Sequence, residues 1–245
     1  MIKAIWLLSF CTAVGCETMG QARTPLLQSS QLQVEAAELC EKEGQYESAF
    51  EWYVIAATRF NNADAAFNLA NMASRGAGIK LNDPMAMAAE FYRKAADLGN
   101  AKAPFHLGVL YHTGKGLSQS FREAENWYRK GASLGDASAQ FALGVMLTSP
   151  SGRPLVPVEG AKWFLAAAEQ GHHPSQFELA KLLESGIVVP RDLIQAHKWF
   201  NLAAASGDPN AIARRNALSK RLLPAQLEKA QELASQWKPG EPKIR

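Results

Sequence analysis

The sequence predicts an all-α fold, a solenoid of stacked helix pairs, on two observations: a long repeat and helical periodicity within each repeat. A pair of aromatic residues recurs every 36 positions along the 245-residue chain, followed each time by two small residues and a glycine. The pairs are Phe91-Tyr92, Trp127-Tyr128, Trp163-Phe164 and Trp199-Phe200, with an earlier copy at Trp52-Tyr53. One unit of this length cannot bury its own apolar face, so such units stack on their neighbours.

Each repeat is expected to contain two helices. In residues 100–135, apolar residues recur at three- and four-residue steps in one stretch around Leu107 and a second around Trp127. This spacing is typical of amphipathic helices. A glycine-rich linker, Gly114-Lys115-Gly116 in this repeat, separates the two stretches. The second helices are expected to start near polar residues: Asp83, Ser120 and Asp192.

Consecutive repeats are joined by a glycine and a polar residue, as in Gly99-Asn100, Gly135-Asp136 and Gly207-Asp208. Glycine adopts the left-handed conformation that ends a helix, and Asn or Asp accepts hydrogen bonds from the first amides of the next one. We therefore expect the chain to reverse within about two residues at each junction.

The aromatic rings of the repeat are interpreted as core residues that fill the space between helices. Alanines three positions before the pairs, such as Ala124, allow the helices to approach closely. Burying one such ring stabilises the fold by roughly 1.5 to 3 kcal/mol. A role in stacking on a ligand is the alternative interpretation.

The consensus of the repeat identifies a family. One copy contains, in order, Ala103, Leu107, Gly108, Tyr111, Gly114, Gly116, Ala124, Trp127, Tyr128, Lys130, Ala132 and Gly135. This pattern resembles the Sel-one-like repeat family, a relative of the tetratricopeptide repeats. The resemblance implies a right-handed α/α solenoid, a superhelix of helix pairs, and a role in protein interaction.

The repeat divides the chain into nine segments. We expect a signal peptide at 1–15, a flexible linker at 16–29, a degenerate first repeat at 30–61, full repeats at 62–99, 100–135, 136–171 and 172–207, capping helices at 208–237 and a flexible tail at 238–245. In the first repeat Phe60 replaces the closing glycine, and the last helix is expected to start near Pro224 and end by Trp237. The proline-rich linker at 149–157 is expected to be an irregular connector or, alternatively, a binding loop.

The first residues predict export. Lys3 precedes an uncharged stretch that is too short to span a bilayer permanently and leads into Thr12-Ala13-Val14-Gly15-Cys16. Small residues before a cysteine resemble the cleavage motif of bacterial lipoproteins, in which Cys16 would carry the lipid. Cleavage after Ala22, giving a soluble periplasmic or secreted protein, is the alternative. Both predict export into or across the bacterial cell envelope.

Charge and cysteine content exclude other classes. With 26 Lys and Arg against 23 Asp and Glu, the chain lacks the basic excess of a nucleic-acid-binding protein, and Arg214, Arg215, Lys220 and Arg221 are interpreted as a solvated surface of the cap. Only Cys40 lies in the repeat region, so no disulfide framework is expected there. It is predicted to be a buried, inert thiol.

We predict no catalytic site, cofactor or metal. His106 and His112 are six residues apart on one helix, a spacing that turns them away from each other. His172-His173 occupies a junction between repeats and is interpreted as part of a turn. An unrecognised hydrolase site remains a third hypothesis for the function.

The resemblance implies a groove lined by the first helix of each pair, on the face turned away from its partner helix. The predicted partner-binding residues are Asn68, Asn71, Arg75, His106, Val109, His112, Val145, Glu178, Lys181 and Glu184. We expect a non-catalytic scaffold of the cell envelope that binds a peptide or helix of an unknown envelope protein. The alternative is a peptidoglycan-associated factor that regulates cell-wall enzymes.

Overall fold

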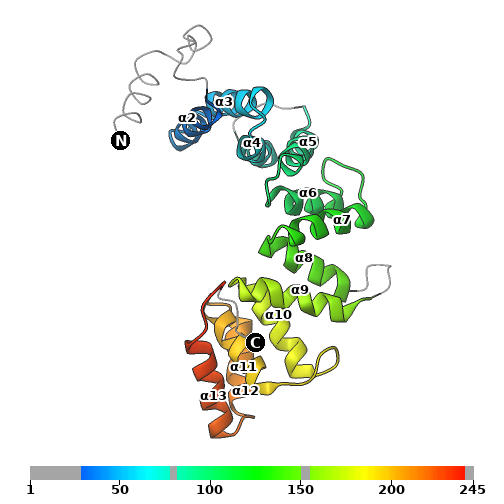
Figure 1. Ribbon diagram of the computed structural model, residues 1–245, viewed down its shortest axis with the longest axis vertical. Coiled ribbons are helices and arrows are strands. Elements are labelled where there is room, and N and C mark those ends of the chain that lie inside the picture. Colours follow the sequence, from blue (N-terminus) through cyan, green and yellow to red (C-terminus); the bar gives the residue numbers. More distant parts are fainter. Residues whose placement is uncertain (1–28, 78–81, 150–154, 241–245) are drawn as a thin grey trace. The chain divides into compact units, whose positions relative to one another are not determined.

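The computed structural model describes residues 29–77, 82–149 and 155–240, and these residues form α-helices without strands (Figure 1). The leader motif with Cys16 and the expected linker up to Gln28 lie outside these ranges. So do Pro150 and Pro154 of the 149–157 connector. The helices are α2 (Ser30–Lys42), α3 (Tyr46–Arg59), α4 (Ala63–Arg75), α5 (Pro84–Asp97), α6 (Ala103–Thr113), α7 (Phe121–Ser133), α8 (Ala137–Thr148), α9 (Pro157–Glu169), α10 (His173–Ser185), α11 (Leu193–Ala204), α12 (Pro209–Ser219) and α13 (Pro224–Ser235).

The chain divides into two compact units between Ser120 and Phe121. In the first unit, each helix from α2 to α6 packs against the next one along the chain. In the second unit, α7 to α12 pack in the same successive manner and α13 packs against α11. Each unit is therefore a stack of helices, as the repeat predicts. No helix in the described ranges is both long and apolar enough to cross a bilayer.

The junctions between repeats have the predicted cap geometry. Gly99 and Gly135 adopt φ values of 95° and 88°, in the left-handed region that glycine enters without strain. The Oδ1 atom of Asp136 accepts a hydrogen bond of 2.7 Å from the amide of Ala139, in the first turn of α8. Asn100 likewise accepts from the amides of Lys102 and Ala103.

The first repeat closes differently because it lacks the glycine. Asn61, one position after Phe60, takes the left-handed conformation with φ 50°. Asn tolerates this region better than most other residues. The side chain of the following Asn62 then caps α4 through the amide of Ala65 at 2.9 Å. The helix thus ends one residue later relative to its aromatic pair than α5, α7 and α9 do, while the reversal itself has three residues, 60–62, like those at 134–136 and 170–172.

The two rings differ in burial in four of the five aromatic pairs. The second rings are core residues, from 0 to 4% exposed: Tyr53, Tyr92, Tyr128, Phe164 and Phe200. Of the first rings, Trp199 is buried, and the core prediction is wrong for the half-buried Trp52, Phe91, Trp127 and Trp163. Their position on the helix turns them partly outward: Lys130 lies over the Trp127 ring, and the Trp163 indole donates to Glu159.

The second unit is closed by the two capping helices. Leu218 of α12 and Leu222 join the core that contains Phe164, Trp199 and Phe200, and Trp237 packs its ring edge-on against Trp199 at 6.0 Å between centroids. Pro224 is the first residue of α13, where the sequence predicts the last helix to start. These helices cover an apolar surface that the last repeat would otherwise expose.

Two residues of the first unit, Cys40 and Gly116, have little free space around them. Cys40 is 1% exposed, which agrees with its predicted role as a buried thiol. Gly116, in the linker after α6, lies so close to the first turn of α5 that a Cβ there would collide with the backbone of Met85 and Ala86. The linker therefore requires glycine for space as well as for its positive φ.

Candidate functional site

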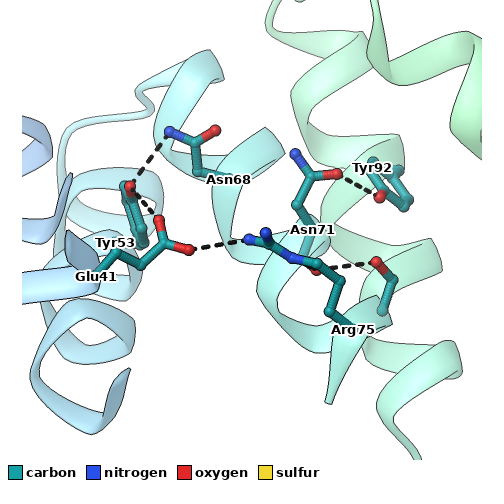
Figure 2. A network of polar contacts seen from close by, with 7 residues as sticks. Glu41, Tyr53, Asn68, Asn71, Arg75 and Tyr92 are labelled. Carbon is teal, nitrogen blue, oxygen red and sulfur yellow. Dashed lines mark hydrogen bonds and ion pairs between the residues drawn. The ribbon is translucent and has the colours of Figure 1, made fainter. Parts of the chain in front are cut away.

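The predicted partner-binding residues of α4 belong to a polar network, which we call the α4 network (Figure 2). Glu41 of α2 accepts hydrogen bonds from the Tyr53 hydroxyl at 3.1 Å and from the Arg75 guanidinium at 2.9 Å. Asn68 donates to the Tyr53 hydroxyl at 3.4 Å. The Tyr92 hydroxyl donates to Oδ1 of Asn71 at 2.7 Å.

The two tyrosines connect this network to the core. Their rings are buried between helices, while their hydroxyls reach the polar face of α4. Burial, followed by the charge of Glu41, raises the pKa of Tyr53, and burial also raises the pKa of Tyr92. Both hydroxyls are therefore protonated donors at any physiological pH. Asn68 and Asn71 thus make structural hydrogen bonds, and Arg75 is the exposed member of the network.

The predicted residues of α6 lie in different surroundings. The His106 ring stacks on Tyr92 with 5.0 Å between centroids and 11° between planes, and meets Phe67 edge-on at 5.3 Å. This places His106 in an aromatic cluster of the first unit. Val109 and His112 are half-buried on the same helix.

The predicted residues of α10 line a groove in the second unit, which we call the α10 groove. It has a volume of about 620 Å³, within the range of about 300 to 1,000 Å³ that is typical of ligand sites. Its lining includes the apolar residues Phe164 and Leu182, and its remaining residues are polar or charged: Thr148, Ser149, Glu178, Lys181, Glu184, Ser185, Arg214 and Arg221.

Charged side chains in this groove form two groups. Lys181 pairs with Glu178 at 2.7 Å and lies over the Phe177 ring. Glu184, whose side chain is 14% exposed, accepts from Arg214 with one carboxylate oxygen and from Arg221 with the other. One buried carboxylate thus holds two guanidinium groups, which are about half exposed.

The structure brings together three of the predicted residues, Glu178, Lys181 and Glu184, in one groove. Val145 of α8 is 36% exposed and does not line that groove. Sequence reasoning missed Arg214 and Arg221, which we assigned to a solvated cap surface. A signal existed, because Arg214 stands 36 positions after Glu178 and therefore occupies the same place in the repeat.

The histidines in the second unit have structural roles. His172 is the N-cap of α10: its Nδ1 atom accepts from the Ser175 amide at 3.3 Å, and its ring packs against Phe141. This supports the interpretation of His172 as a turn residue. His197 of α11 is buried, and its Nε2 atom forms a hydrogen bond of 2.8 Å with the Ser219 hydroxyl. This hydrogen bond links α11 to α12. Within the described ranges, no cluster of three His, Cys, Asp or Glu residues could hold a metal.

Comparison with known proteins gives consistent results. The sequence profile of the Sel1 repeat matches residues 40–59, 63–100, 101–136, 137–172 and 173–208. The fold is similar to the crystal structure of a Sel1 repeat protein from Oxalobacter formigenes, with 25% identity, 88% of each chain covered and a TM-score of 0.72.

A second similar structure is a protective antigen, present in uropathogenic Escherichia coli strains, that displays an SLR fold. It is 26% identical with a TM-score of 0.53, and the match covers 85% of this chain but only 53% of the antigen. No curated protein matches the chain significantly.

Proposed function

Because this chain belongs to the Sel1 repeat family, we propose that it is a non-catalytic interaction scaffold of the bacterial cell envelope, which binds a peptide or helix of a partner protein in a groove. Sel1 repeat proteins generally mediate protein–protein interaction, and their fold is a scaffold rather than an enzyme fold. The envelope location and the groove are the specific parts of the proposal.

The observation that carries the proposal is the α10 groove. It lies on a first helix, where three of the predicted residues are, and its lining combines two apolar residues with charged ones. Grooves of this kind suit a peptide because the apolar lining contacts an apolar side chain of the peptide, while the polar groups fix which residue of the peptide lies there. In the α4 network, by contrast, the asparagines are occupied by core tyrosines.

A crosslinking experiment tests the groove. A photoreactive amino acid at Lys181, in the groove, is expected to give an adduct of defined mass with an envelope protein in living cells. The same residue at Lys162, exposed on α9 of the same unit, is the matched control. Equal adducts at both positions, or none at Lys181, would contradict the proposal. Sedimentation of the purified chain with peptidoglycan, without a protein partner, would favour the cell-wall alternative.

The envelope location rests on the leader motif around Cys16. We propose that Cys16 carries a lipid that anchors the scaffold on the periplasmic side of a membrane. Metabolic labelling with a fatty acid is expected to mark the wild-type chain and to fail for Cys16→Ser. A wild-type chain that is exported, unlabelled and cut after Ala22 would show a soluble periplasmic protein instead.

A further inference from the structure

We propose that the α10 groove recognises an acidic segment of its partner protein, whose carboxylates bind Arg214 and Arg221. This inference deepens the proposed function and rests on it, because it names the chemistry of the partner. It begins from the charges that line the groove. Three cations, Lys181, Arg214 and Arg221, face two carboxylates, Glu178 and Glu184, so the lining carries one net positive charge.

The carboxylates of the groove are already engaged, whereas the guanidinium groups keep unused capacity. Both oxygens of Glu184 accept from arginine, and Glu178 pairs with Lys181. A guanidinium has five N–H donors in a rigid fork. Each arginine gives one nitrogen to Glu184, and their side chains remain 54% and 47% exposed. The groove thus offers donors to a ligand and matches a ligand that brings acceptors.

Glu184 also fixes where those donors lie. Its side chain is largely buried and contacts the guanidinium groups of Arg214, from α12, and Arg221, from the segment after α12. It therefore holds both guanidinium groups beside one carboxylate in the groove. An arginine held in this way loses less side-chain entropy when it binds a carboxylate. Thr148, Ser149 and Ser185 line the same groove, but the hydroxyls of Thr148 and Ser185 already donate to carbonyls of their own helices, so the arginines are the main donors for a ligand.

A carboxylate in a peptide fits better than an isolated anion, because the groove is larger than one ion requires and has apolar residues in its lining. A volume of about 620 Å³ has room for several side chains. Leu182, which is half-buried, would contact the aliphatic parts of the bound segment, whereas Phe164 is 1% exposed and belongs to the core. The partner is therefore expected to present Glu or Asp residues on an exposed strand or helix.

The experiment measures binding of fluorescein-labelled hexaglutamate to the full chain by fluorescence anisotropy, with hexaglutamine and hexalysine as controls. Hexaglutamate is expected to bind saturably and the controls not to bind. Arg221→Gln is expected to weaken binding by about tenfold, as loss of a charge-assisted contact does. Lys220→Gln removes the same charge one residue away, outside the groove, and is expected to change binding by less than about twofold.

A second measurement on the wild-type chain does not depend on the folding of a variant. Phenylglyoxal modifies exposed guanidinium groups, and mass spectrometry identifies the modified residues. Hexaglutamate is expected to protect Arg214 and Arg221, but not the exposed Arg59 and Arg191. Equal protection of all four arginines, equal effects of Arg221→Gln and Lys220→Gln, or equally tight binding of polyphosphate would overturn the proposal.

The two proposals fail in different ways. If a partner crosslinks at Lys181 but hexaglutamate does not bind, the acidic-segment inference is wrong and the scaffold function stands. If hexaglutamate binds with the expected arginine dependence but no protein crosslinks at Lys181, the chemistry of the groove stands and the scaffold function is wrong.

Discussion

The α4 network and the α10 groove are built on corresponding helices of two repeats, yet they use their polar side chains differently. At the second position of the aromatic pairs, the first unit has Tyr53 and Tyr92, and the hydroxyls bind Asn68 and Asn71. Around α10 the corresponding rings are Phe164 and Phe200, which have no hydroxyl. Glu178 and Lys181, at the corresponding positions of α10, pair with each other instead.

One oxygen atom on a core ring can therefore decide how the polar side chains of a whole helix face are used. A buried hydroxyl needs a partner, so it draws the nearest polar side chain into the core. Where phenylalanine replaces tyrosine, the polar side chains of the first helix are not required for the core. They can line a hollow surface and meet a ligand. The experiments below test this contrast, in order of decreasing expected effect on stability.

The largest effect is expected from removing a core ring under the groove. Phe164→Ala is expected to lower the free energy of unfolding by about 3 to 5 kcal/mol, because the ring is 1% exposed and leaves a cavity. Urea unfolding followed by circular dichroism measures this. Leu165→Ala is the matched control, since that neighbour is 39% exposed. A loss of similar size in both variants would show that Phe164 is not a core residue.

A smaller effect is expected from breaking the α4 network. Glu41→Ala removes the acceptor of the Tyr53 hydroxyl and of Arg75, and is expected to lower the free energy of unfolding by about 1 to 3 kcal/mol. Glu38→Ala, at an exposed position of the same helix, serves as the control and should lose much less. If both variants unfold at the same urea concentration, the network contributes no stability.

The ion cluster of the groove is expected to contribute still less. Arg221→Gln breaks one half-exposed ion pair with Glu184, and such pairs contribute about 0 to 1 kcal/mol. Urea unfolding should therefore be nearly unchanged while hexaglutamate binding falls. A loss of stability as large as that of Glu41→Ala would mean that Arg221, too, belongs to the framework, and the contrast between the two regions would disappear.

The smallest effect concerns pH. Burial, the main cause, lowers the pKa of His172 below its ordinary value of 6.5, so the folded state resists its protonation. The stability contributed by neutral His172 is complete above pH 6.5 and is lost as the pH falls from there through the folded-state pKa. His172→Asn keeps a capping residue, as at Asn62, and should weaken this pH dependence. Urea unfolding of the wild-type chain and the variant at several pH values measures the difference.

Much of the fold could be predicted because the same sequence pattern occurs in several copies along the chain. The 36-residue period predicts paired helices, and the junction glycines predict the reversals seen at Gly99 and Gly135. The unequal burial of the two rings in a pair could not be predicted from composition, because both are large and aromatic. It depends on the rotation of each helix about its axis, which only packing determines.

The candidate site was predicted in part. The helical face and residues such as Lys181 follow from the family resemblance, but Arg221 lies after α12 and outside any repeat position that we assigned to the groove. Its contact with Glu184 depends on how the chain turns between α12 and α13. Long-range pairings of this kind carry no local sequence signal, which is why Arg221 was assigned to a solvated surface.

The close approach of Gly116 to the first turn of α5 has a consequence for how this protein can change over evolution. A linker that touches the preceding repeat cannot lengthen or gain a side chain there without moving that repeat. Insertions are therefore expected elsewhere, and the array is more readily extended by duplicating whole repeats, linker included. The same contact would make this edge of the array a poor place to graft a foreign loop.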